Sequence, residues 1–299
     1  MNGFDLALSI SDVTSEKLAS LAEAGIFDAE ISLTEKAMKA FDYPKMAKIA
    51  AEIGVKFGSV HIPFVGDLRP LDPASLDRDV RLKTVDCFAE LIRVAGQNGT
   101  GIAVIHPSLE PTLDAERRER IERARESFAN LADVAAENGV VIAVEDLPRS
   151  CLGNCAEELD YITDADKRLR VCFDVNHLLL GTHVDFVKTL GKKIVTTHIS
   201  DYDFRDERHW LPGEGKIEWQ ELVGLLEGVG YTGRWLYELN FSPDPKGMRR
   251  PRELQLSDIK KNYDEIMSGI KPTAFGKIDD EYCAEYCSWG KRFSEMGGR

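Results

Sequence analysis

Short apolar runs rich in Val, Ile, Phe and Ala recur along the whole chain, and each is followed by a longer segment with helical spacing. The runs predict strands at residues 4–10, 28–33, 56–62, 101–106, 140–146, 169–174, 193–200 and 233–240. The longer segments predict helices at 14–25, 44–54, 74–98, 114–138, 155–166, 183–191, 218–230 and 254–269. This alternation predicts parallel strands joined by right-handed crossovers, which defines the α/β class.

Eight repeats favour closure of the strands into a (βα)8 TIM barrel over an open sheet. Several predicted helices end in a glycine just before the next strand, which suits a left-handed C-cap. These are Gly25, Gly54, Gly99, Gly139 and Gly230. The open doubly wound sheet is the alternative, but the chain reads SISDVTSE after its first strand and lacks the glycine-rich dinucleotide loop of that fold.

One domain accounts for most of the chain. A barrel of this kind typically needs about 250 residues, so we expect it to occupy residues 1–270 of the 299. Residues 271–299 form a C-terminal extension, whose aromatic residues could line one face of a short helix. Those aromatics are Tyr282, Tyr286, Trp289 and Phe293. We expect the extension to pack on the barrel or on a partner subunit, and the sequence leaves the oligomeric state open.

The net charge of −13 disfavours nucleic acid as a partner, because binding to phosphates depends on a basic field. Acids and bases alternate in residues 114–127, which is typical of a solvated helix face. No apolar run is long enough to span a membrane, and the first residues lack the basic start of a signal peptide. We therefore expect a cytoplasmic protein whose six cysteines are mostly reduced and fill the core.

Ionisable side chains gather where the predicted strands stop. The third to eighth strands end in His61, His106, Glu145, Asp174 with His177, His198, and Glu238. Chemistry in such barrels lies at the C-terminal ends of the strands, so these side chains should meet there. A single buried histidine is usually structural. Burying several ionisable groups without a function, however, would cost roughly several kcal/mol for each unpaired charge.

A divalent cation would resolve this arrangement. Glu145, Asp174 and Glu238 offer anionic oxygens and His198 offers an imidazole nitrogen, so these four residues are the predicted metal ligands. Three carboxylates with one imidazole suit Mn²⁺, Mg²⁺ or Co²⁺ at least as well as Zn²⁺. We expect one ion, with Mn²⁺ favoured, and open coordination positions for two neighbouring substrate oxygens.

Four motifs, in order and on the expected strands, carry a resemblance to a known family. FDVNH is followed by HISDYD, then by PGEGKIEW and finally by YELN. The chain resembles the xylose isomerase-like TIM barrel superfamily over roughly residues 56–240. The resemblance is strongest to its sugar phosphate isomerase and epimerase branch, which includes the ketose 3-epimerases.

The resemblance implies roles for the residues that match. Glu145, Asp174, His198 and Glu238 match the family's metal ligands, and Glu145 and Glu238 also match its proton-transferring pair. His177 matches a substrate-contacting histidine, while His61 and His106 match histidines that line the pocket in many relatives. Residues 212–215, PGEG, match a loop that closes beside the substrate.

One departure from the epimerase pattern affects substrate specificity. The ketose epimerases usually carry an arginine shortly before the glycine loop, where this chain has Glu207, Arg208 and His209 in a longer loop. We assign Glu207 and His209 to substrate binding. His209 and the ionisable residues at the strand ends also match the superfamily's type IV abasic-site endonucleases, which hold three zinc ions. The one difference is Glu207, which stands in place of an aspartate. A three-zinc endonuclease is therefore an alternative, opposed by the net charge of −13.

The resemblance predicts a metal-dependent isomerase or epimerase of a keto sugar or sugar phosphate. Glu145 or Glu238 would remove a proton next to a metal-bound carbonyl, giving an enediolate, and the other would return one. A sugar lyase or dehydratase, such as one acting on a keto-inositol, would begin with the same step. Whether the substrate is phosphorylated stays open, because the basic residues after the eighth strand could bind phosphate or be a solvated loop. They are Lys246, Arg249, Arg250 and Arg252.

Overall fold

The computed structural model describes residues 3–64, 66 and 70–279. Its main sheet has eight parallel strands in the order β7-β6-β5-β4-β3-β2-β1-β8. The strands are β1 (Asp5–Ile10), β2 (Asp28–Ser32), β3 (Lys56–His61), β4 (Ile102–Ile105), β5 (Val141–Glu145), β6 (Arg170–Asp174), β7 (Ile194–His198) and β8 (Arg234–Tyr237). A parallel bridge between Ile199 and Tyr237 brings the two ends of the sheet together. The predicted TIM barrel is confirmed.

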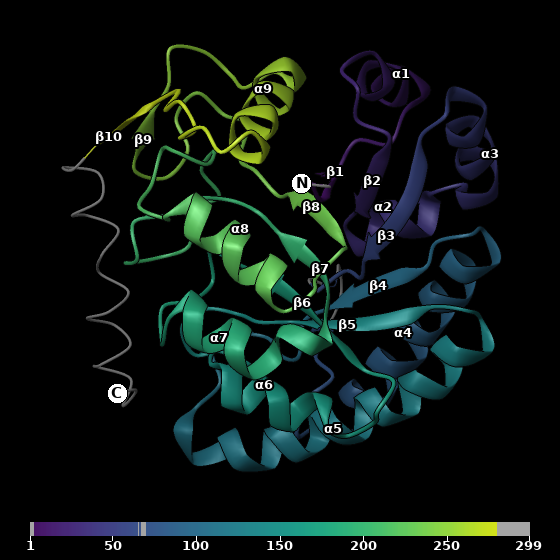
Figure 1. Cartoon of the computed structure of the whole chain (residues 1–299). Helices are drawn as coiled ribbons and strands as arrows, with labels where there is room; N and C mark the ends of the chain where they lie inside the picture. The colour runs from purple at the N-terminus through teal and green to yellow at the C-terminus, as the bar shows by residue number, and fades with distance from the viewer. Residues whose placement is uncertain (1–2, 65, 67–69, 280–299) are drawn as a thin grey trace.

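Helices form the outer layer of the barrel (Figure 1). Those that follow the strands are α1 (Ser15–Glu23), α3 (Tyr43–Ile53), α4 (Arg78–Gln97), α5 (Asp114–Glu137), α6 (Ala156–Thr163), α7 (His183–Leu190), α8 (Trp219–Gly228) and α9 (Leu256–Met267). The described chain adds α2 (Glu35–Ala40) and a 3-10 turn, η1 (Gly191–Lys193), which the sequence pattern did not predict. At six residues, α2 is too short for helical periodicity to be recognised, although Thr34 caps it.

Helix ends at the predicted glycines are confirmed, whereas two strands end earlier than predicted. The glycines expected as left-handed helix ends have φ between 67 and 90° in the structure, as predicted. The seventh and eighth strands stop sooner than predicted, at His198 and Tyr237. Beyond His198, Ile199 still pairs with Tyr237, but through an isolated bridge and not a continuous ladder.

Two apolar layers hold the barrel together. Inside the barrel, Val104, Ala143 and Cys172 pack against one another. The larger layer lies between the strands and the helices and includes Phe128, Phe173 and Trp235. Cys151, Cys155 and Cys172 are free thiols, of which Cys151 and Cys172 are buried, while Cys283 and Cys287 lie outside the described residues.

The chain after α9 begins the C-terminal extension. Its described part contains β10 (Lys277–Ile278), which pairs antiparallel with β9 (Met248–Arg249) from the loop after β8. The aromatic helix predicted from Tyr282 to Phe293 lies outside the described residues. In the part of the chain that is described, each helix is too short or too polar to cross a lipid bilayer.

Candidate active site

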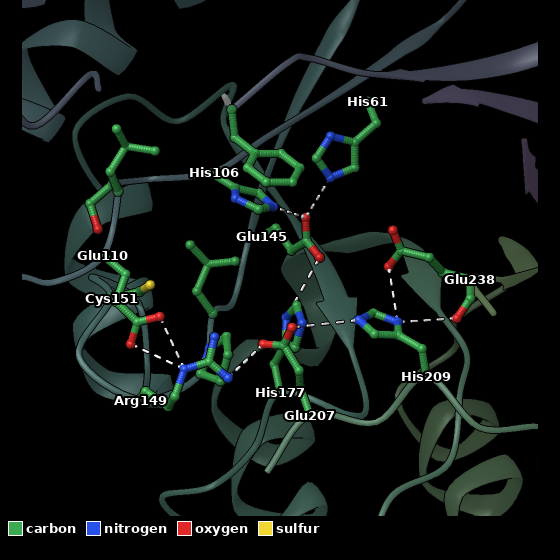
Figure 2. A pocket seen from close by; sticks show the side chains of 15 residues that line it. His61, His106, Glu110, Glu145, Arg149, Cys151, His177, Glu207, His209 and Glu238 are labelled. Atoms are coloured by element: carbon green, nitrogen blue, oxygen red, sulfur yellow. Dashed lines mark hydrogen bonds and ion pairs between the residues drawn. The ribbon is translucent and has the colours of Figure 1, made fainter. Parts of the chain in front are cut away.

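The side chains that end β3 to β8 surround one cavity of about 190 Å³ (Figure 2). Seven of the predicted site residues line it: His61, His106, Glu145, His177, Glu207, His209 and Glu238. The other two, Asp174 and His198, are fully buried next to Glu145. The topology thus brings together all of the residues that the sequence singled out.

His198 Nδ1 lies among three carboxylates. It is 3.0 Å from Glu145 Oε1, 3.2 Å from Glu238 Oε2 and 3.9 Å from Asp174 Oδ2. The four potential ligand atoms all lie within 4.8 Å of one another. Oxygen and nitrogen ligands on opposite sides of a small divalent cation are about 4 to 5 Å apart, so one ion can contact all four.

The charges of these groups are poorly balanced by protein partners alone. Burial raises the pKa of Asp174 well above its usual range, and the nearby charges of Glu238 and Glu145 raise it further. Burial opposes a charge on His198, but surrounding acids that include Glu238, Glu30 and Glu145 raise its pKa well above the ordinary value. Asp174 Oδ2 accepts no hydrogen bond from the residues that the structure describes. A buried acidic group with an unpartnered oxygen has the donor chemistry that suits a divalent cation.

Two further histidines hold the other oxygen of Glu145. His61 Nε2 and His106 Nε2 lie 3.1 Å and 3.2 Å from Glu145 Oε2, while His61 Nδ1 is placed to donate to the Ile62 carbonyl. Burial lowers the pKa of His61, but its bond to Glu145 outweighs burial and raises the value to about 9. Phe64 stacks on the His106 ring with the ring centroids 4.3 Å apart. Both histidines are therefore fixed in orientation at the cavity wall.

The opposite wall is formed by His177, Glu207, His209 and Arg149 (Figure 2). His177 Nδ1 donates to the Asp146 carbonyl at 2.8 Å, which leaves Nε2 directed away from the backbone. Burial lowers the pKa of His177, so this imidazole is neutral at neutral pH. Burial opposes the charge of Glu207, but His177, His209 and Arg149 lower its pKa to about 2.

The PGEG segment does not border the cavity, unlike the loop that it matches. Asp201 accepts the backbone N–H of Gly213 at 2.8 Å and that of Ile217 at 3.1 Å. A Cβ on Gly215 would lie 2.3 Å from Asp201 Oδ1, so only glycine permits this close approach. Glu214 is buried against Arg250, with 2.7 Å between Glu214 Oε2 and Arg250 Nη2. These contacts hold the segment in the layer behind the site.

Sequence reasoning missed Glu30 on β2, which is fully buried. Glu30 Oε1 lies 3.0 Å from His198 Nε2, although the ring N–H is not aligned for a linear hydrogen bond. Ser59 donates its hydroxyl to the other oxygen of Glu30 at 2.6 Å. A carboxylate beside the second ring nitrogen of a metal-ligating histidine fixes its tautomer and orientation. The available signal was an acid in the middle of a short strand, away from the strand end where site residues are expected.

Replacing Glu30 by glutamine should weaken metal binding. Loss of the carboxylate beside His198 Nε2 is expected to lower Mn²⁺ affinity by about 10- to 100-fold, as for other partners of ligating histidines. The affinity can be measured by competition with a fluorescent chelator. Ser59→Ala is the matched control, since it keeps the carboxylate and should have a smaller effect. An affinity of Glu30→Gln equal to that of the wild type would contradict this role.

The fold and the cavity define a class of protein: a βα barrel with acids and histidines gathered at the carboxyl ends of its strands. A family model described as xylose isomerase-like TIM barrel matches residues 18–257. The chain belongs to this family.

The chain is also similar to individual proteins and solved structures. An uncharacterized protein of Methanocaldococcus jannaschii is 31% identical over 218 residues, which are 70% of each chain. The D-psicose 3-epimerase of Clostridium cellulolyticum H10, solved with D-tagatose, has a TM-score of 0.67 at 18% identity, covering 97% of this chain and 96% of its own. The 3-keto-D-glucoside 4-epimerase of E. coli has a TM-score of 0.71 at 17% identity, covering 89% and 99%. The solved structures with this fold thus include epimerases of keto sugars.

Proposed function

We propose that the protein is a divalent-metal-dependent isomerase or epimerase of a keto sugar. The observation that carries the proposal is the position of His198 Nδ1, within 4 Å of carboxylate oxygens of Glu145, Asp174 and Glu238 at the edge of the cavity. The epimerases with the same fold support the reaction class.

Glu145, Asp174, His198 and Glu238 would hold the cation, with Mn²⁺ favoured and Mg²⁺, Co²⁺ or Zn²⁺ as alternatives. When bound, it would act as a Lewis acid that polarises a substrate carbonyl and offsets the negative charge that develops beside it. Two carboxylates that border the cavity can then serve as the acid and base.

Glu145 and Glu238 are the proposed proton-transferring pair. Both line the cavity, and their oxygens lie 3.0 Å and 3.2 Å from the same nitrogen, His198 Nδ1. One removes the proton from the carbon beside the carbonyl, and the other delivers a proton to that carbon or to its neighbour. His61 and His106 hold one oxygen of Glu145, which keeps this carboxylate in place during the transfer.

The substrate is proposed to be a small, uncharged sugar. Three cavity histidines, His106, His177 and His209, can exchange hydrogen bonds with hydroxyl groups. Both ring nitrogens of His61 are engaged by Ile62 and Glu145. Three of the four basic residues after β8 are engaged in ion pairs of the fold. Arg249 pairs with Asp244 at 2.8 Å, Arg250 is buried against Glu214, and Arg252 pairs with Asp258 at 2.6 Å. This pairing favours the structural reading of the basic loop over a phosphate site.

A second candidate, a three-zinc phosphodiester hydrolase acting on abasic DNA, is favoured by one observation. Two further groups of potential metal ligands adjoin the first: His61 with His106 and Glu145, and His177 with Glu207 and His209. The net charge of −13 and the small cavity support the sugar instead.

Turnover assays separate the candidates. The Mn²⁺-loaded protein is incubated with a panel of keto sugars, inososes and their phosphates, and with duplex DNA containing an abasic site. The proposal predicts conversion of at least one keto sugar to an epimer or an isomeric aldose. Elimination products would indicate a lyase or dehydratase instead, and cleavage of the DNA without any sugar conversion would refute the proposal.

A further inference from the structure

Arg149 is an unusual residue of the cavity wall. It follows β5 and has φ +54°, in the left-handed region that residues other than glycine rarely adopt. His209, across the cavity, has the same φ of +54°. Strained backbone of this kind persists only where the surroundings enforce it, and it often marks functional sites. Both side chains face Glu207, which lies between them (Figure 2).

Three carboxylates hold the Arg149 guanidinium. Its Nη1 lies 2.8 Å from Glu207 Oε2 and 2.7 Å from Asp206 Oδ1, and its Nε lies 3.0 Å from Glu110 Oε2. Burial opposes the charge, but attraction to Glu207, Glu110 and Asp206 outweighs it, so the pKa stays above the ordinary arginine value. Arg149 is therefore a permanent cation in a fixed position. With three acids around it, it offers little attraction to an anionic substrate.

The same Glu207 belongs to a second group of potential metal ligands. One donor atom each from His177, Glu207 and His209 lies within 4.8 Å of the others. His209 Nε2 is 3.9 Å from Glu207 Oε1, while Glu207 Oε2 is bound to Arg149. A metal ion here would have to share its only anionic ligand with an existing ion pair. It would also approach a guanidinium that cannot lose its charge.

We propose that Arg149 prevents metal binding at His177, Glu207 and His209, and so reserves these side chains for substrate hydroxyl groups. The inference deepens the proposed function, on which it rests, because it explains why His177, Glu207 and His209 would contact substrate although they form a set of metal donors. Arg149 is by this account a residue that determines specificity and not a metal ligand or a proton carrier.

Zinc content measured on the full chain tests the inference. Wild type and Arg149→Met are loaded with Zn²⁺, desalted and analysed by mass spectrometry for metal per chain. The variant should bind one more zinc than wild type. Arg149→Lys, which keeps the charge, should match wild type, and Arg149→Met combined with His209→Ala should lose the additional ion. Should Arg149→Met fail to fold, Arg149→Gln removes the charge while keeping a hydrogen-bond donor.

A crystal structure of the zinc-loaded variant, with anomalous scattering, would place the additional ion on His177 and His209. Equal zinc content in wild type and in the uncharged variants would overturn the inference. So would zinc on these histidines in wild type. If wild type held no metal at Glu145, Asp174, His198 and Glu238, the proposed function would be refuted. The amount of zinc bound at His177 and His209 in wild type and in the variant would still decide the inference.

Discussion

Replacement of Glu238 by glutamine should lower sugar turnover by about 10³-fold, within the range that positioned acids and bases contribute. Glutamine has nearly the same shape, but it can neither accept the substrate proton nor supply an anionic oxygen 3.2 Å from His198 Nδ1. We expect a similar loss for Glu145→Gln, because the proposed reaction needs both carboxylates.

The matched control is Glu227→Gln on the exposed side of α8, which should leave turnover unchanged. Metal content must be measured in each variant, because Glu145 and Glu238 are also proposed ligands. Reconstitution at saturating Mn²⁺ separates the two roles. If both metal-loaded variants kept wild-type turnover, these glutamates would not be the proton-transferring pair.

Removal of the metal should abolish turnover. Dialysis against a chelator would leave Glu145, Asp174 and Glu238 without their counter-cation, and the substrate carbonyl without a Lewis acid. Added Mn²⁺ should restore the rate. It should also stabilise the fold, by about 2.7 kcal/mol at a hundred times its dissociation constant.

Asp174→Ala provides the matching variant, since Asp174 is a proposed ligand that does not line the cavity. It should fail to regain activity at the Mn²⁺ concentration that restores wild type. Thermal unfolding with and without Mn²⁺ gives a second readout, with a rise in Tm for wild type and little rise for the variant. Full activity of a protein shown to be free of metal would exclude a metal-dependent reaction.

The barrel could be predicted because the sequence pattern that specifies it is local and is repeated along the chain. Apolar residues recur at a regular spacing within each strand and each long helix. Gly54 and Gly139 mark helix ends that the structure confirms. The short helix α2 has too few residues for a period. Its position depends on packing, for example of the buried Met38.

The clustering of the proposed metal ligands was predictable for a topological reason. Parallel strands bring their carboxyl ends to one side of a barrel, so Glu145 and His198 had to lie close together. Glu30 was missed because it lies within a strand, where apolar residues are expected. Arg149 was missed because its position depends on ion pairs with Glu110 and Asp206, far away in the sequence, and loop paths of this kind leave no periodic signal.

Solvent deuterium uptake tests the central claim most directly. The Mn²⁺-loaded protein is incubated with the keto sugar that it converts, in deuterated water, and the recovered sugars are analysed by NMR. Removal of a proton beside the carbonyl by Glu145 or Glu238 predicts deuterium at that carbon, or at its neighbour after isomerisation. It also predicts loss of uptake in at least one of the Glu145→Gln and Glu238→Gln variants at saturating Mn²⁺. Conversion of the sugar without deuterium in substrate or product would contradict proton transfer through these carboxylates.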